Sequence, residues 1–190
     1  MTPTFSIIVP TILRPTLAAT LDSIQAAGLA PGDEVLVMVD AEHAHKPLPP
    51  GVRAARAAPV AVYYSEVSCG GWGGPARNLG VTAAKGSHLL FIDDDDVYRP
   101  GAIDTIRAMV AEAPATMHIW RMLARGGRVV WSSPRLAQGN IGTPMFAVPR
   151  FAAGEWTSRY EGDFDFALSS RMNLGGDAVA WHDTVLVDCG

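Results

Sequence analysis

The residues best suited to chemistry are four consecutive aspartates, Asp93–Asp96, which directly follow the mainly apolar run His88–Ile92. Such a run is typical of a buried strand. Four adjacent carboxylates repel one another, and a divalent cation would compensate their charge. Mg²⁺ and Mn²⁺ bind hard oxygen ligands, often one or two carboxylates with phosphate and water. We therefore expect a metal–phosphate site here, with Asp93 and Asp95 on one face because alternate residues of an extended chain share a face.

A second segment with chemical potential is the glycine-rich turn 70–74, ahead of a helix that Pro75 opens. Glycines let the backbone approach a ligand closely, and the N-terminus of a helix favours anions. Arg77 lies in the first turn of that helix and could bind phosphate through two N–H groups. The spacing matches neither the dinucleotide fingerprint nor the phosphate-binding loop of P-loop proteins. Alone, the segment is a weak signal and favours a tight turn without a ligand.

The elements that must position these residues alternate between strands and helices. The expected strands are 5–9, 34–39, 60–67 and 88–92, and the expected helices are 15–28, 52–57, 75–86 and 100–112. This alternation predicts a mostly parallel sheet flanked by helices, and ligands of such sheets bind beyond the carboxyl ends of the strands. Asp40, the glycine turn and the aspartate run all follow strands, so we expect them to converge on one cleft.

The second half of the chain has a different pattern. We expect a hairpin of 117–123 with 128–132, a strand over 140–148, a helix over 163–172 and a last strand over 184–187. No internal repeat or flexible linker interrupts the chain. The prediction is one domain, 1–190, with a ligand-binding half (1–112) and a second, smaller β/α half (113–190).

Five motifs in this order resemble glycosyltransferase family 2, which has the GT-A fold. They are Phe5-Ser-Ile-Ile-Val-Pro-Thr, Arg14-Pro with Leu17…Leu21-Asp-Ser-Ile, Glu34-Val-Leu-Val-Met-Val-Asp40, Pro75-Ala-Arg-Asn-Leu-Gly and Phe91-Ile-Asp-Asp-Asp-Asp. Each motif alone is common, whereas five in register over residues 5–112 are specific. The resemblance implies an α/β protein with the GT-A fold that moves a sugar from a nucleotide-sugar, with a UDP-sugar favoured, to an acceptor hydroxyl.

The resemblance also implies roles for single residues in the first half. Those implied at the nucleotide are Pro10, Thr11, Asp40, Arg77, Asn78, Asp93 and Asp94. Among them, Pro10, Thr11 and Asp40 would hold the base and ribose. Asp95 would be the main protein ligand of Mn²⁺ or Mg²⁺, and Asp93 would contact the ribose or the metal. Because acids occupy all four positions, the family's usual Asp-x-Asp pattern can be aligned with this run in two ways that differ by one residue.

The second half resembles the acceptor side of the family, where an acidic residue at the start of a helix acts as catalytic base. Asp163 is the best match, Glu161 is the reserve and Asp165 is third, because the usual adjacent Glu-Asp pair is absent. A helix-capping carboxylate is the plainer interpretation and is compatible with that role. Since related enzymes often complete the metal shell with a C-terminal histidine, His182 is a candidate ligand, with a structural role as the alternative.

These roles predict an inverting transfer in which Asp163 takes the proton of the acceptor hydroxyl. A retaining reaction stays open. Two other functions compete with a glycosyltransferase. A sugar nucleotidyltransferase would carry a lysine in a glycine-rich segment after the first strand, which is absent here. A non-catalytic nucleotide-sugar-binding module would be expected to lose the acids, yet they are present.

The acceptor is predicted from charge. Between Arg99 and Arg171 there are nine arginines and six acids. Arginine without lysine is equally well explained by a GC-rich genome. The functional interpretation is that some of Arg121, Arg125, Arg128 and Arg135 line the acceptor mouth and receive an anionic acceptor, such as a phosphorylated molecule or a hydroxymethylated DNA base; a glycan is a further candidate.

The remaining observations on composition concern the cellular location of the protein and its aromatic residues. Two cysteines in 190 residues suit a reducing compartment, and no apolar run approaches the ~20 residues of a membrane span. With no signal peptide visible either, we expect a cytoplasmic protein without an obligate protein partner. Five tryptophans are expected in the core or at its rim, with sugar stacking as the alternative.

Overall fold

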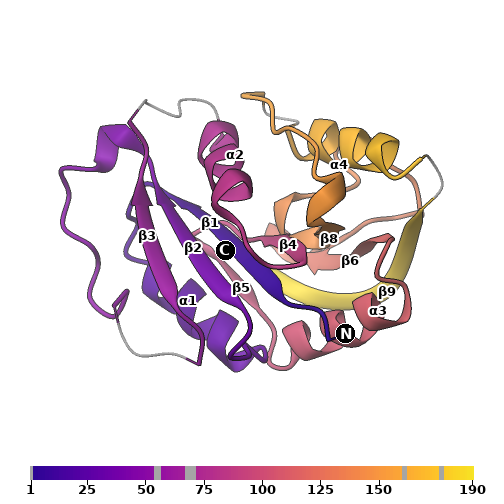
Figure 1. The fold of residues 1–190 in the computed structure, drawn as a ribbon, viewed down its shortest axis with the longest axis horizontal. Helices are drawn as coiled ribbons and strands as arrows, with labels where there is room; N and C mark the ends of the chain where they lie inside the picture. The colour runs from indigo at the N-terminus through magenta and orange to yellow at the C-terminus, as the bar shows by residue number, and fades with distance from the viewer. Residues whose placement is uncertain (1, 54–56, 67–71, 160–161, 176–177) are drawn as a thin grey trace.

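The computed structural model describes residues 2–53, 57–66, 72–159, 162–175 and 178–190. Figure 1 shows a mixed sheet between two layers of helices. The strands are β1 (Phe5–Thr11), β2 (Glu34–Val39), β3 (Val60–Tyr64), β4 (His88–Phe91), β5 (Asp96–Tyr98), β6 (Met117–Leu123), β7 (Val129–Val130), β8 (Phe146–Pro149) and β9 (Val179–Cys189). The α-helices are α1 (Leu17–Ala26), α2 (Gly74–Ala83), α3 (Ala102–Glu112) and α4 (Gly162–Asn173). Short 3₁₀ turns are η1 (Ala41–His43), η2 (Arg125–Gly127), η3 (Thr143–Met145) and η4 (Arg150–Ala152).

The sheet is parallel where the sequence predicted a parallel sheet. Its order is β3-β2-β1-β4-β8-β6-β9-β5, with β7 paired to β6. Strands β3, β2, β1 and β4 run parallel to one another. In the second half, β8 runs antiparallel to both β4 and β6, whereas β9 runs parallel to β6. One sheet therefore continues through both halves of the chain, and the boundary at residue 112 stays a prediction.

Two hydrophobic cores lie on opposite faces of the sheet because β1 is buried on both faces. On one face Ile7 and Val9 belong to a cluster with α1 and α3, whose contributors include Leu21 and Ile106. On the other face Ile8 belongs to a cluster with α2 and α4. Figure 1 shows the two pairs of helices on either side of the sheet. The continuous apolar run of β1 thus predicted correctly a strand that is covered on both faces.

The N-terminal end of β1 is anchored by a buried ion pair. Asp33 accepts hydrogen bonds from the backbone N–H of Phe5 and of Ala30, both at 2.9 Å. Arg107 of α3 pairs with the same carboxylate at 2.6 Å and lies 4.7 Å over the ring of Phe5. This network sets where β1 starts, and therefore where its C-terminal residue, Thr11, meets the aspartate run.

Several elements differ from the sequence expectation. The segment before β8 is a 3₁₀ turn rather than a strand, since Pro144 has no N–H to donate to a ladder. The expected helix over 52–57 is absent from its described residues, which lie in turns and bends; a helix this short is marginal without packing. Strand β5 was not predicted, and β9 is longer than expected because it pairs with both β6 and β5.

No helix in the described part of the chain is long and apolar enough to cross a bilayer.

Candidate active site

A cleft of about 530 Å³ opens at the carboxyl ends of β1, β2 and β4. It is lined by Pro10, Thr11, Ile12, Arg14, Asp40, Glu42, His43, Trp72, Gly73, Ala76, Arg77, Asp93, Asp94, Asp95 and Arg125, and we call it the aspartate cleft. Asp40, the described end of the glycine turn and the aspartate run therefore converge as predicted. Asp40 also starts the turn η1, where its side chain accepts a hydrogen bond from Glu42 N–H at 2.9 Å.

The aspartate run is a turn, not an extended segment. The N–H of Asp96 donates to the carbonyl of Asp93 at 3.1 Å, which closes the turn. Asp93 and Asp95 are partly exposed, with 33% and 26% of their side chains accessible, whereas Asp94 and Asp96 are buried. Because Asp94 lines the same cleft as Asp93 and Asp95, the expected separation of two faces does not hold for Asp94.

Each of the first three aspartates meets an arginine from a different part of the chain. Asp93 pairs with Arg77 of α2. Asp94 pairs with Arg14 and accepts a hydrogen bond from the Thr11 hydroxyl at 2.5 Å. Asp95 lies 3.2 Å from Arg125 and 3.9 Å from Arg14.

The fourth aspartate has a different environment. Asp96 accepts a hydrogen bond from the N–H of Gly190 at 3.2 Å and does not line the cleft. Burial raises the pKa of its carboxyl to about 7, and the negative charges of Asp93 and Asp95 raise it further. Asp96 is therefore a poor candidate for a permanently charged ligand.

The donor set at this turn fits a magnesium- or manganese-type site that is completed by a ligand. In the described residues, no three His, Cys, Asp or Glu side chains are grouped as a complete metal shell. Asp93 and Asp95 offer two partly exposed carboxylates with hard oxygen donors. Mg²⁺ commonly takes one or two protein carboxylates and completes its shell with phosphate and water. The residues present therefore suit a cation bound together with a diphosphate.

His182 lies away from this site, which corrects the expectation that it completes the metal shell. It is on β9, seven residues before Cys189, and Cys189 is paired with Asp96. His182 does not line the aspartate cleft. Its Nε2 atom lies 3.0 Å from Nδ1 of His118, and the two rings stack. Burial lowers the pKa of both imidazoles. His182 is therefore a structural histidine.

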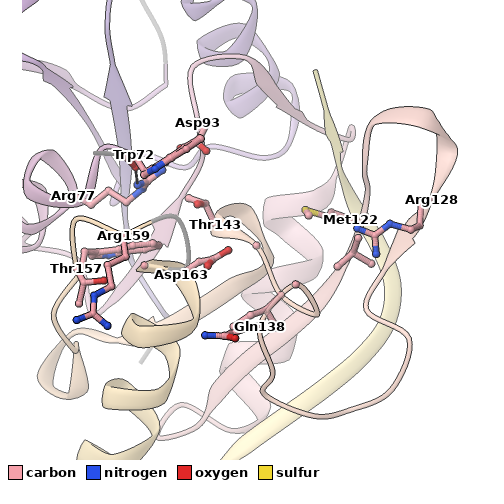
Figure 2. A pocket seen from close by; sticks show the side chains of 16 residues that line it. Trp72, Arg77, Asp93, Met122, Arg128, Gln138, Thr143, Thr157, Arg159 and Asp163 are labelled. Atoms are coloured by element: carbon pink, nitrogen blue, oxygen red, sulfur yellow. Dashed lines mark hydrogen bonds and ion pairs between the residues drawn. The ribbon is translucent and has the colours of Figure 1, made fainter. Parts of the chain in front are cut away.

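A second cleft of about 460 Å³ adjoins the first (Figure 2). It is lined by Trp72, Arg77, Asp93, Met122, Arg128, Val130, Gln138, Gly139, Ile141, Gly142, Thr143, Trp156, Thr157, Arg159, Gly162 and Asp163, and we call it the α4 cleft. Of its lining residues, Trp72, Arg77 and Asp93 also line the aspartate cleft. The two clefts therefore meet at these three residues.

Asp163 is the acidic residue that the first turn of α4 presents to this cleft, and Figure 2 shows its carboxylate pointing into it. Burial raises its pKa to about 6, although a hydrogen bond from Phe164 N–H at 2.8 Å and the charge of Arg77 act in the opposite direction. Asp165, the third candidate, accepts a hydrogen bond from the Thr157 hydroxyl at 2.6 Å and does not line the cleft. Glu161, the reserve candidate, lies outside the described residues.

Arg77 is the buried cation where the clefts meet. Its guanidinium pairs with Asp93, donates to the carbonyl of Trp72 at 2.6 Å and lies 4.6 Å over the ring of Trp156.

Asn78, implied near the nucleotide, lines neither cleft. Instead its side chain makes two hydrogen bonds of 2.9 Å to the backbone of Trp156. Asn78 is thus a brace between α2 and the segment before α4, and no sequence signal pointed to Trp156 as its partner.

The arginines proposed at the acceptor mouth are divided among several places. Arg128 lines the α4 cleft, whereas Arg125 lines the aspartate cleft. Arg121 pairs with Asp183 at 2.7 Å and lies 4.4 Å over Trp131. Arg135 lines neither cleft. Sequence reasoning missed two lining arginines, Arg14 and Arg159. The position of Arg14 after the first predicted strand was a usable signal for the aspartate cleft.

Comparison with known proteins identifies the family. The model of glycosyl transferase family 2 matches residues 6–146. The chain is a family 2 glycosyltransferase. This membership favours a glycosyltransferase over a sugar nucleotidyltransferase. No curated protein matches the sequence of this glycosyltransferase closely enough to count as a relative.

Solved structures confirm the GT-A fold of this glycosyltransferase. S. aureus TarS matches with a TM-score of 0.72 at 19% identity, covering 98% of this chain and 36% of TarS. TarS 1–349 matches with the same TM-score and identity, with 60% of that chain covered. TarS 1–349 in complex with UDP-GlcNAc matches with a TM-score of 0.70 at 19% identity, covering 98% of this chain and 58% of that one. The glycosyltransferase thus spans three fifths or less of these TarS chains.

We predict that Asp96 makes the glycosyltransferase less stable as the pH rises from about 4 to about 7. The pKa of Asp96 is raised from 3.8 to about 7 in the folded chain. The folded state therefore holds a proton that the unfolded state has lost, and the free energy of unfolding falls over this range. Asp96→Asn keeps a neutral side chain at every pH. In EDTA, urea unfolding followed by circular dichroism should show the variant about 2–4 kcal/mol more stable than wild type at pH 8, and only about 1 kcal/mol more stable at pH 4.5.

Only the difference between the two proteins isolates Asp96, because the histidines with lowered pKa act in the opposite direction. Asp163→Asn serves as the comparison, since Asp163 has the smaller pKa shift, to about 6. An Asp96→Asn variant no more stable than wild type at pH 8 would contradict the prediction.

Proposed function

We propose that the enzyme binds a nucleotide-sugar and a divalent cation in the aspartate cleft and transfers the sugar, with inversion, to an acceptor hydroxyl in the α4 cleft. One observation carries the proposal: the two clefts meet at Arg77 and Asp93, and Asp163 lines the second cleft beyond them. A donor cleft and an acceptor cleft that join at charged residues are what a transfer between two bound substrates requires.

The donor side is supported by the strand ends. Pro10, Thr11 and Asp40 line the aspartate cleft at the carboxyl ends of β1 and β2, where the base and ribose would lie. This placement follows the general rule for ligands of parallel sheets. The structural neighbour TarS 1–349 is solved with UDP-GlcNAc and with UDP, which supports a UDP-sugar as the first donor to test.

Asp95 and Asp93 would hold Mn²⁺ or Mg²⁺, because their carboxylates are the partly exposed acids of the run. When bound, the cation would neutralise the negative charge of the leaving diphosphate. Arg14 and Arg125 line the same cleft. Both are within reach of carboxylates in this structure, and their guanidinium groups can bind phosphate oxygens as well as carboxylates.

Asp163 would be the general base. A base is most effective when its pKa lies near the working pH, and burial moves the pKa of Asp163 to about 6. The carboxylate would accept the proton of an acceptor hydroxyl while the oxygen attacks the anomeric carbon from the acceptor side. Because the nucleotide would leave on the opposite, aspartate-cleft side, attack from the α4 cleft favours inversion.

The acceptor would be anionic. Two cations, Arg128 and Arg159, line the α4 cleft in addition to Arg77, which is already paired with Asp93. Figure 2 shows Arg128 across the cleft from Arg77. The guanidinium fork suits phosphate because it binds two oxygens at once. A phosphorylated small molecule and a hydroxymethylated base in DNA both carry such phosphates.

Asp95→Asn should abolish metal-dependent donor binding, since a neutral amide is a poor replacement for a charged ligand. A ligand that binds only the folded state raises its stability by mass action. Thermal unfolding with UDP-GlcNAc and MnCl₂ should therefore raise the Tm of wild type but not of the variant. Calorimetric titration of Mn²⁺ into the UDP-bound protein gives a second measure, independent of turnover. Asp104→Asn, an exposed carboxylate on α3 outside both clefts, is the matched control.

If Asp95→Asn keeps the full metal-dependent shift while Asp94→Asn loses it, the register of the metal ligands is displaced by one residue. A wild-type protein that is not stabilised by any of a panel of UDP-, GDP-, dTDP- and CMP-sugars with Mn²⁺ would refute the proposed donor.

Asp163→Asn should leave donor affinity nearly unchanged and reduce kcat by ~10²–10⁴-fold, the range for loss of a general base. In wild type, kcat/KM should fall as the pH drops below about 6, because protonation removes the base. The residual activity of the variant should lack this acidic limb. Asp165→Asn is the matched control, since that carboxylate is two residues away but is turned to Thr157. Should Glu161→Gln be the inactive variant instead, the base is assigned to the wrong residue.

Arg128→Ala should raise the KM of an anionic acceptor by about 10–100-fold, as expected for loss of one hydrogen bond to a charged group. Arg135→Ala, which removes an arginine outside both clefts, should have little effect. Transfer is measured from labelled donor to glucose 6-phosphate, to DNA with 5-hydroxymethylcytosine and to glucose, at about 50 and 200 mM salt. Recognition of DNA through phosphates would weaken steeply with salt. Efficient, salt-insensitive transfer to glucose would refute the proposal that the acceptor is anionic. It would leave the proposed sugar transfer itself unaffected.

A further inference from the structure

The junction of the two clefts contains one large exposed aromatic side chain. Of the three residues that line both clefts, Arg77 and Asp93 are paired with each other. The third is Trp72, which is 66% exposed. Trp120, Trp131 and Trp156 are buried. The expectation that the tryptophans lie in the core or at its rim therefore holds for these three and for Trp181, which is partly buried against one core, and not for Trp72.

The backbone of Trp72 is held in place by Arg77. Its carbonyl accepts a hydrogen bond of 2.6 Å from the guanidinium of Arg77, which is itself buried between Asp93 and Trp156. Trp72 has φ 62° and Gly73 has φ 74°. The left-handed region is common for glycine but rare for a bulky side chain. The chain thus keeps a tryptophan in an unfavourable conformation at the point where the clefts meet (Figure 2).

We propose that Trp72 determines specificity by stacking against the ring of the donor sugar at the point of transfer; this rests on the proposed function. The sugar has to occupy the junction, because one of its bonds breaks in the aspartate cleft and another forms in the α4 cleft. A pyranose ring has faces made of C–H groups, and a large flat indole removes such apolar surface from water. The indole N–H can in addition donate to a sugar hydroxyl.

This assignment predicts a contact with the sugar and none with the nucleotide. Arg77 and Asp93 are already paired with each other at the junction, whereas the indole of Trp72 offers an exposed apolar face. Such a face distinguishes sugars, because the orientation of each ring hydroxyl changes how flat the face of the sugar is. Trp72 therefore selects the donor by its sugar part.

The test compares UDP with UDP-GlcNAc by calorimetric titration in MnCl₂. Trp72→Ala should bind UDP within about twofold of wild type and UDP-GlcNAc at least about tenfold more weakly, a loss of about 1.4 kcal/mol. Trp72→Phe should recover most of the affinity, since it keeps an aromatic face. Phe151→Ala is the matched control, because Phe151 is 75% exposed and lines neither cleft. If UDP-GlcNAc is a poor donor, UDP-glucose and UDP-galactose are used in the same comparison.

A second measurement needs no destabilising change. Iodide should quench an exposed fraction of the tryptophan fluorescence in wild type that is absent in Trp72→Phe. UDP-GlcNAc should protect this fraction and UDP should not. Equal losses for UDP and UDP-GlcNAc in Trp72→Ala, or no loss for either, would overturn the inference. The inference is also overturned if wild type binds UDP and binds no UDP-sugar more tightly than UDP. If wild type binds no nucleotide or nucleotide-sugar, the proposed function fails first and the inference fails with it.

Discussion

The constraint on which the active site depends is the compensation of charge in the run Asp93–Asp96. Four carboxylates in one turn cannot all stay ionised close together without cations or burial of the neutral form. The chain uses both means. Arg77 and Arg14 take up the charge of the first two aspartates, and Asp96 is buried with a pKa of about 7. Because these arginines come from α2 and from the segment between β1 and α1, the same ion pairs join the elements that form the cleft.

This arrangement connects the aspartate cleft and the α4 cleft through Arg77. Its guanidinium contacts Asp93 in one cleft, and in the other it lies over Trp156 and lowers the pKa of Asp163. Any ligand that changes the charge at Asp93 therefore changes the electrostatic environment of Asp163, because both carboxylates share this buried cation. Binding of a divalent cation at Asp93 would strengthen the attraction of Arg77 for Asp163.

The sequence predicted the part of the fold that follows from local pattern. The apolar runs of β1, β2 and β4 indicated strands buried on both faces, and their polar ends indicated the cleft. It predicted less of the second half, because β5 and β9 are stabilised by pairing between residues far apart, such as Asp96 with Cys189. His182 illustrates the same limit. A histidine near the C-terminus is compatible with metal binding by residue type, and only the register of β9 with β6 shows that it meets His118 instead.

The carboxylates with raised pKa show how the site balances stability against function. Burying Asp96 and Asp163 favours their protonated forms, so near neutral pH ionisation of either group costs the folded state free energy relative to the unfolded chain. For Asp163 as the proposed general base, that cost would have a functional counterpart, because a carboxylate with a pKa near 6 is a better proton acceptor than one near 4 while still being ionised at pH 7. At Asp96 the carboxyl lines neither cleft, and its protonation instead reduces the negative charge of the turn that presents Asp93 and Asp95. In the proposed reaction the two acids would act differently: Asp163 would accept a proton, whereas protonated Asp96 would lessen the repulsion among its neighbours.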